Sequence, residues 1–76
     1  MSPLQSRMAR SALKWSYIDL AKNAHVGIST AQEFEKGARV REYSKKKLEK
    51  AYLNTGLIEF IGDNGVICKF DLFLEN

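Results

Sequence analysis

The sequence is poor in the residues that build disulfide bonds and metal sites. Its 76 residues include one cysteine, Cys68, and one histidine, His25. A single cysteine cannot form an internal disulfide bond, and no Cys/His cluster is present to bind zinc. The sequence therefore predicts a protein without a metal or other cofactor. It also contains no constellation of catalytic residues, so we do not expect an enzyme.

Long apolar runs are absent as well. No stretch approaches the ~18 apolar residues that a membrane span requires. The segment MSPLQSR at positions 1–7 contains no apolar stretch like that of a signal peptide. We therefore expect a cytoplasmic protein that does not bind membranes. A chain of 76 residues has room for one small domain but not for a deep catalytic cleft, because most of its apolar side chains are needed in the core.

Charge is distributed unevenly along the chain. Residues 1–50 carry eleven Lys/Arg and five Asp/Glu, a formal charge of +6, whereas residues 51–76 carry one and four, a formal charge of −3. A basic half of this kind is typical of a surface that binds phosphate groups. The alternative is a solvated surface without such a function, and charge alone does not distinguish the two.

Four segments carry the signals of helix starts and ends. Ser2, Pro3 and Gln5 combine a capping box with proline at the first helical position. The second predicted helix begins at Ser16, with Asp19 at its N3 position and Trp15 and Leu20 in the positions of a hydrophobic staple. The predicted helices cover residues 3–14, 16–24, 28–36 and 44–55.

The second and third predicted helices are joined by only three residues, 25–27. Two short helices joined so closely must cross at a steep angle, which is the helix-turn-helix geometry. We expect Ile18 to lie on the inner face of the second helix together with Leu20. Gly27 is the predicted N-cap of the third helix, and Gly37 follows its end as a typical C′ residue.

The fourth helix is predicted to begin at Ser44, with Tyr43 and Leu48 in the positions of a hydrophobic staple. The lysines at positions 45–47 would then occupy its first turn, where positive charge opposes the helix dipole by some tenths of a kcal/mol each. Such a placement suggests a use for the charge, such as binding phosphate. A solvated lysine run is the commoner explanation.

Hydrophobic residues alternate from position 57 onward, which predicts two strands. The first covers residues 57–61 and the second runs from Val66 to about Leu74. Asn64 and Gly65 favour a type I′ turn between them. Cys68 would lie on the apolar face of the second strand, in the core.

A family resemblance appears in residues 15–26, WSYIDLAKNAHV, and 34–37, FEKG. These segments resemble the phage-repressor and Cro-like (XRE) helix-turn-helix family, whose usual form is S-x-x-x-L-A-x-x-A-G-V-S followed by F-E-x-G. The resemblance covers about residues 2–56. His25 replaces the family's turn glycine, at a place that needs positive φ, and histidine is among the residues that tolerate it. Gly27 replaces the usual serine cap, and Ala31 replaces a larger aliphatic residue.

The resemblance implies a four-helix, repressor-like helix-turn-helix domain over residues 1–56. The alternating pattern adds a C-terminal β-hairpin over residues 57–76, so the predicted fold is mainly α. The resemblance also implies that the third helix lies in the major groove of double-stranded DNA. By position, Gln32 is then a candidate to bind adenine, Glu33 to accept from cytosine and Ile28 to contact a thymine methyl group, with Ser29 beside them. An exposed helix face without DNA contact is the alternative for Gln32 and Glu33.

Phosphate contacts are expected from flanking positions. Ser16 and Tyr17, at the start of the second helix, would present free N–H groups to an anion. Lys36, Arg39 and Arg41 follow the third helix and are candidates for the backbone beside the groove.

Arg10 has a different role in the resembling family, where its counterpart pairs with the glutamate of F-E-x-G. That residue is Glu35 here, so we expect a structural ion pair between the first and third helices. His25 as a metal ligand, base or pH switch is the weaker interpretation, because the sequence offers it no partner.

The implied function is that of a small sequence-specific transcriptional regulator, with repression the simplest mode. Residues 57–74 are expected to form a homodimer through their strands, which would place two recognition helices about 34 Å apart. Alternatively, the hairpin packs on the fourth helix. Two other functions stay open: an antitoxin whose C-terminal strands bind a toxin protein, and a protein-interaction module that no longer binds DNA.

Overall fold

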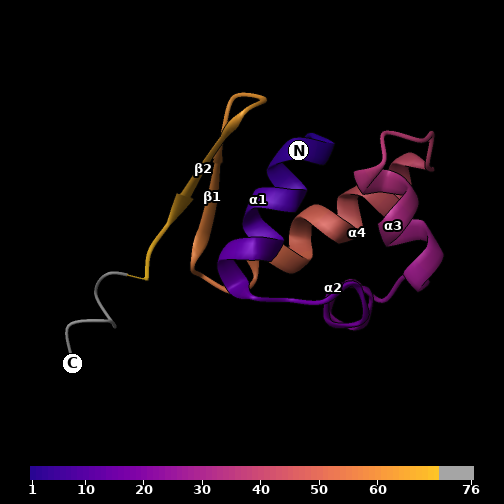
Figure 1. Cartoon of the computed structure of the whole chain (residues 1–76), viewed down its shortest axis with the longest axis horizontal. Coiled ribbons are helices and arrows are strands. Elements are labelled where there is room, and N and C mark those ends of the chain that lie inside the picture. The colour runs from indigo at the N-terminus through magenta and orange to yellow at the C-terminus, as the bar shows by residue number, and fades with distance from the viewer. Residues whose placement is uncertain (71–76) are drawn as a thin grey trace.

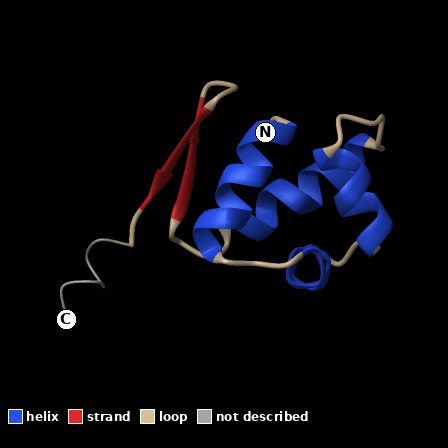
Figure 2. Cartoon of the chain, viewed as in Figure 1, coloured by secondary structure: helices blue, strands red, loops and turns tan. Residues whose placement is uncertain are grey.

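Four helices precede a small antiparallel sheet in the computed structural model, which describes residues 1–70 (Figures 1 and 2). The helices are α1 (Pro3–Leu13), α2 (Tyr17–Ala24), α3 (Ile28–Glu35) and α4 (Glu42–Leu53), and the strands are β1 (Ile58–Ile61) and β2 (Gly65–Cys68). The predicted mainly α fold with a C-terminal hairpin is therefore confirmed.

Local capping signals define the first two helices as predicted. Ser2 and Gln5 form a complete capping box at the start of α1, and Ser16 and Asp19 form another at the start of α2. Helix α2 ends at His25, whose φ of 58° confirms the positive φ expected for this turn position. The turn thus forms without glycine.

Helix α3 begins after Gly27, which has extended backbone angles and makes no side-chain cap. The Gly27 carbonyl oxygen accepts from the Ala31 N–H at 3.2 Å, so the first turn of α3 forms without a capping hydroxyl group. Lys36 is the C-cap and Gly37 follows with a φ of 85°. The predicted limits of this helix differ from the structure by one residue.

The predicted start of α4 is wrong. The helix begins at Glu42 with Arg41 as its N-cap, so Ser44 lies inside the first turn and does not cap it. Tyr43 is 67% exposed and therefore cannot form the predicted staple with the buried Leu48. The lysines at positions 45–47 fall in the second turn, where opposition to the helix dipole is weaker.

The core lies where α2, α3 and α4 meet α1 and the hairpin. Leu20, Leu48 and Tyr52 are fully buried in it, and Ile58 of β1 belongs to the same cluster. Ile18 does not, because its side chain is 51% exposed, so its predicted place on the inner face is wrong. In an eight-residue helix the buried face is filled by three others, which are Leu20, Ala21 and Ala24.

The hairpin pairs Phe60 with Val66 and Ile61 with Gly65, which leaves a three-residue turn over positions 62–64. Only Gly62 has positive φ in this turn, so the predicted type I′ turn at Asn64-Gly65 is wrong. Gly65 is required for space instead, because a Cβ atom there would lie 3.0 Å from the Cβ atom and the carbonyl oxygen of Ile61.

Strand β2 ends at Cys68, earlier than predicted, and the Cys68 side chain is exposed. The prediction of a buried cysteine is wrong, although its strand partner Ile58 is buried. Cys68 is the last residue of β2, and Figure 1 shows the chain leading away from the helices after this strand. The rest of the predicted strand, with Leu72 and Leu74, lies outside the described residues.

Polar contacts fix the hairpin to the start of α1. The Gln5 amide is fully buried and donates to the carbonyl oxygens of Gly62 and Gly65 at 2.8 and 2.9 Å. The Ser2 hydroxyl donates to the Asp63 carbonyl oxygen at 2.6 Å. The same two side chains thus cap α1 and hold the turn. None of the helices in residues 1–70 is long and apolar enough to cross a bilayer.

Candidate nucleic-acid interface

One face of α3 is exposed, and it carries most of the residues predicted to contact bases. Ser29 and Glu33 are exposed, Ile28 is exposed on 43% of its surface, and Gln32 is half-buried. The opposite face of the helix is buried in the core through Ala31 and Phe34. The predicted base-contacting residues are therefore accessible.

A hollow of about 250 Å³ lies beside this face. Ser29 and Glu33 of α3 line it together with Arg39 and Arg41 of the loop that follows. Four of the predicted contact residues thus surround one space, although they are separated by as many as twelve positions in the sequence. Two further hydroxyl residues line the hollow, Thr30 and Ser44.

Ser44 was not among the predicted contact residues. Ser44 was missed because its sequence context was interpreted as a helix cap, whereas the structure places it inside the first turn of α4. Three hydroxyl groups and two guanidinium groups around one hollow are donors suited to a phosphate oxygen. Glu33 is the only acidic side chain among the lining residues.

Lys36, Arg39 and Arg41 are exposed and form no ion pair within residues 1–70. Lys36 ends α3 and Arg41 begins α4, so the cations stand on both sides of the connecting loop. Exposed and uncompensated positive charge of this kind attracts polyanions over a distance of about one Debye length, ~8 Å at physiological salt.

The start of α2 is less free than predicted. The Ser16 N–H donates to the Asp19 carboxylate at 2.8 Å, and the Ser16 hydroxyl accepts from the Asp19 N–H at 3.1 Å. Foremost the hydrogen bond from the Ser16 main-chain N–H lowers the pKa of the Asp19 carboxyl group. The Ser16 N–H therefore already has a partner, and the Asp19 carboxylate lies where a DNA phosphate was expected to bind. The Tyr17 ring, in turn, packs 4.1 Å from the guanidinium carbon of Arg10.

The predicted ion pair between Arg10 and Glu35 is present and joins α1 to the end of α3. The Glu35 carboxylate is 1% exposed and lies 3.1 Å from Nη2 of Arg10, while Nε of Arg10 donates to both carboxylate oxygens at 3.1 and 3.2 Å. This contact, foremost the hydrogen bond to Glu35, raises the pKa of the Arg10 guanidinium. Arg10 also donates to the carbonyl oxygen of Trp15 at 3.2 Å.

Three other residues, the buried Ser6 and Tyr52 and the exposed Arg7, add hydrogen bonds to this region, and sequence reasoning did not identify them. The Ser6 hydroxyl donates to the Glu35 carboxylate at 2.7 Å, and the Tyr52 hydroxyl donates to the Ser6 carbonyl oxygen at 3.0 Å. The Arg7 guanidinium donates to the Glu35 carbonyl oxygen at the end of α3. Burial raises the pKa of the Tyr52 phenol, which keeps it a neutral donor. The bonds to Glu35 fix the end of α3 relative to α1.

Comparisons of the chain with protein-family models, with curated proteins and with solved structures returned no match. Over residues 1–70, no three His, Cys, Asp or Glu side chains are grouped closely enough to hold a metal ion. Only its geometry therefore identifies the candidate site, which is an exposed polar face of α3 beside a hollow with two arginines.

Proposed function

We propose that the chain is a sequence-specific double-stranded DNA-binding protein that acts as a small transcriptional regulator. The observation that carries this proposal is the hollow beside α3, where Ser29 and Glu33 meet Arg39 and Arg41. In this arrangement α3 lies in the major groove with Gln32 directed at base edges, and the arginines contact the flanking phosphates. A bacterial regulator of this kind acts in the cytoplasm, where the chromosome is, and the simplest mode is repression by occupying a promoter.

The rigidity of α3 supports the proposal. A helix of eight residues has little stability of its own, so its orientation depends on packing. Two residues of α3 fix this orientation. Phe34 is buried in the core, and Glu35, at the end of the helix, is bonded to Ser6 and Arg10 of α1. Holding the helix in place before DNA arrives reduces the entropy lost on binding.

Two substitutions separate sequence reading from phosphate contact. Selection from random double-stranded DNA should recover a defined site with the unaltered protein. We expect Gln32→Ala to relax preference within that site, because a bidentate contact to adenine discriminates by about 1–3 kcal/mol. Lys36→Ala should weaken binding to all sequences alike and reduce the salt slope by about 1.

Lys69→Ala is the control for a lost lysine outside the interface: Lys69 follows the hairpin, its ammonium group pairs with Glu59, and light scattering verifies that the variant keeps the oligomeric state of the unaltered protein. It should leave affinity and sequence preference nearly unchanged. A salt-independent affinity, or the same loss from Lys69→Ala as from Lys36→Ala, would contradict the proposed interface.

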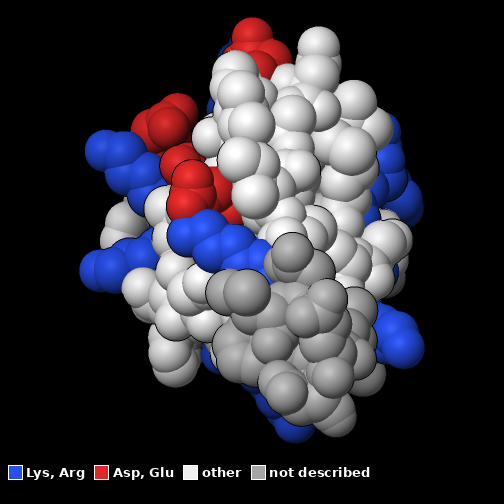
Figure 3. Space-filling model, turned by 90° about the vertical axis from the view of Figure 1, so that its left-hand side faces the viewer, with Lys and Arg blue, Asp and Glu red and all other residues white. Residues whose placement is uncertain are grey.

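We further propose that the hairpin forms a homodimer interface. A two-stranded sheet has one unpaired edge on each strand, and such edges pair readily with another chain. Ile61 and Ile67 are 54% and 41% exposed on this hairpin. Figure 3 shows a broad uncharged area on this side of the molecule. Pairing of two hairpins would cover this area and set the spacing of two recognition helices.

A further inference from the structure

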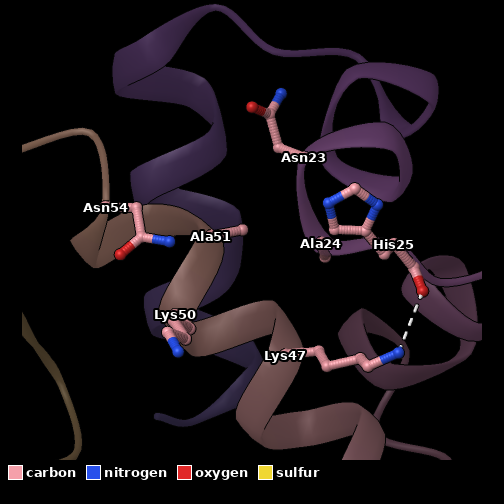
Figure 4. A pocket seen from close by; sticks show the side chains of 7 residues that line it. All are labelled: Asn23, Ala24, His25, Lys47, Lys50, Ala51 and Asn54. Atoms are coloured by element: carbon pink, nitrogen blue, oxygen red, sulfur yellow. Dashed lines mark hydrogen bonds between the residues drawn. The ribbon is translucent and has the colours of Figure 1, made fainter.

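A second cleft lies away from α3, between the end of α2 and the middle of α4 (Figure 4). Its volume is about 400 Å³, within the range of roughly 300–1,000 Å³ that is typical of small-ligand sites. Ala24 and Ala51 are buried where the two helices approach each other, and these small side chains leave the space open. Neither the resemblance nor the proposed DNA contact uses this cleft.

The polar groups of the cleft come from two lysines, two asparagines and one histidine. Lys47 and Lys50 of α4 and its C-cap Asn54 line one side of the space, Asn23 and His25 at the end of α2 line the other, and no carboxylate lines it (Figure 4). A cleft with ammonium and amide groups and without acidic groups favours an anion over a cation or a neutral ligand.

Two of these polar side chains already have partners within the protein. The Lys47 ammonium group lies 3.4 Å from the carbonyl oxygen of His25 and 4.5 Å from the centre of the Tyr43 ring. It therefore already donates to the end of α2. Asn23 donates one N–H to the Asp19 carbonyl oxygen at 2.8 Å. The side chains of Lys50 and Asn54, in contrast, have no hydrogen-bond or ion-pair partner in the part of the chain that the structure describes.

We propose that this cleft binds a phosphate-bearing anion. Lys50 and Asn54 hold the phosphate oxygens from α4, and the second amide N–H of Asn23 and the imidazole of His25 complete the site from α2. Phosphate offers several acceptor oxygens to these donors, and charge-assisted hydrogen bonds of this type are about twice as strong as neutral ones. The cleft is larger than one phosphate group, so it also has room for a small organic group esterified to it.

The test is a titration of the full chain, free of DNA, with inorganic pyrophosphate, followed by the amide NMR signals of α2 and α4. We expect saturable shifts centred on residues 23–25 and 50–54. Lys50→Gln should weaken binding by about tenfold or more, because it removes a charge-assisted hydrogen bond. Lys46→Gln is the matched control: it removes the same charge from the same helix at an exposed position that does not line the cleft.

No shift at these residues up to ~10 mM pyrophosphate, well beyond a millimolar Kd, would overturn the proposal. Equal weakening by Lys46→Gln and Lys50→Gln would overturn it too, since it would show general attraction to a basic helix. A repeat with the protein saturated by DNA identifies the source of the phosphate. Loss of the shifts indicates a DNA backbone phosphate, whereas their persistence indicates a free phosphate ester. The titration of the free chain does not depend on DNA binding, so its failure would leave the proposed function standing.

Discussion

At the scale of single residues, Glu35 is the point where three helices are tied together. Its carboxylate is buried and accepts from Arg10 and Ser6 of α1, and Ser6 in turn accepts from Tyr52 of α4. Among the residues that the structure describes, no buried side-chain polar atom lacks a partner. A buried carboxylate is tolerated only with such complete satisfaction, because its desolvation is costly.

Glu35→Gln is therefore expected to lower the free energy of unfolding by about 2–3 kcal/mol. Removing one partner of a buried pair costs about 3–5 kcal/mol, and the partial exposure of Arg10 reduces this figure. Urea denaturation measures the change. Glu42→Gln is the control, because Glu42 is exposed, lies 4.0 Å from Lys45, and should contribute less than about 0.5 kcal/mol. Equal effects of the two substitutions would contradict a central role for Glu35.

At the scale of elements, the helices end in two different ways. Lys14 closes α1 in the left-handed region, with φ of 58° and ψ of 34°. Lys36 closes α3 in the right-handed helical region, with φ of −82°. Only the first conformation is strained for a residue with a Cβ atom, and glycine is the usual residue there.

Lys14→Gly should thus raise the free energy of unfolding by about 0.5–1 kcal/mol, because it relieves the left-handed strain. Lys36→Gly should lower it by about 0.5–1 kcal/mol, because glycine loses more backbone entropy in a right-handed position. Thermal unfolding of both variants provides the comparison. Changes of the same sign would show that the local backbone conformation does not decide the outcome.

At the scale of the whole molecule, the hairpin and the helices share one core. Ile58 is packed in the cluster that contains Leu48 and Tyr52, and Gln5 of α1 bonds to the hairpin turn. An isolated two-stranded hairpin is marginally stable in water, so the helices provide the stability that this one requires. The hairpin is consequently held as a rigid edge that can be presented to a second chain.

Ile67→Lys tests the proposed dimer without disturbing this core, because Ile67 is on the exposed part of β2. Light scattering of the full chain should give the mass of two chains, and the variant should give the mass of one, since a charge at an apolar interface is desolvated without a partner. Ile18→Lys is the control, as Ile18 is equally apolar and 51% exposed but lies on α2. A one-chain mass for the unaltered protein would refute the dimer.

The sequence by itself determined the features that depend on neighbours three or four positions apart. Both capping boxes, the turn at His25 and the ends of α2 and α3 were predictable for this reason. Most of the residues of the candidate interface were predicted from the family resemblance, and they share one helix face and one short loop. The ion pair of Arg10 with Glu35 was predictable only from the family resemblance.

Tertiary structure decided the rest, because it depends on contacts between distant segments. The true start of α4 and the exposure of Ile18 and Cys68 follow from which faces the neighbouring elements cover. The bond from Gln5 to Gly65 spans sixty positions, and no local pattern indicates it. The hollow beside α3 and the cleft beside α4 likewise exist only once the helices are packed, since each is the space that small or polar side chains leave between two elements.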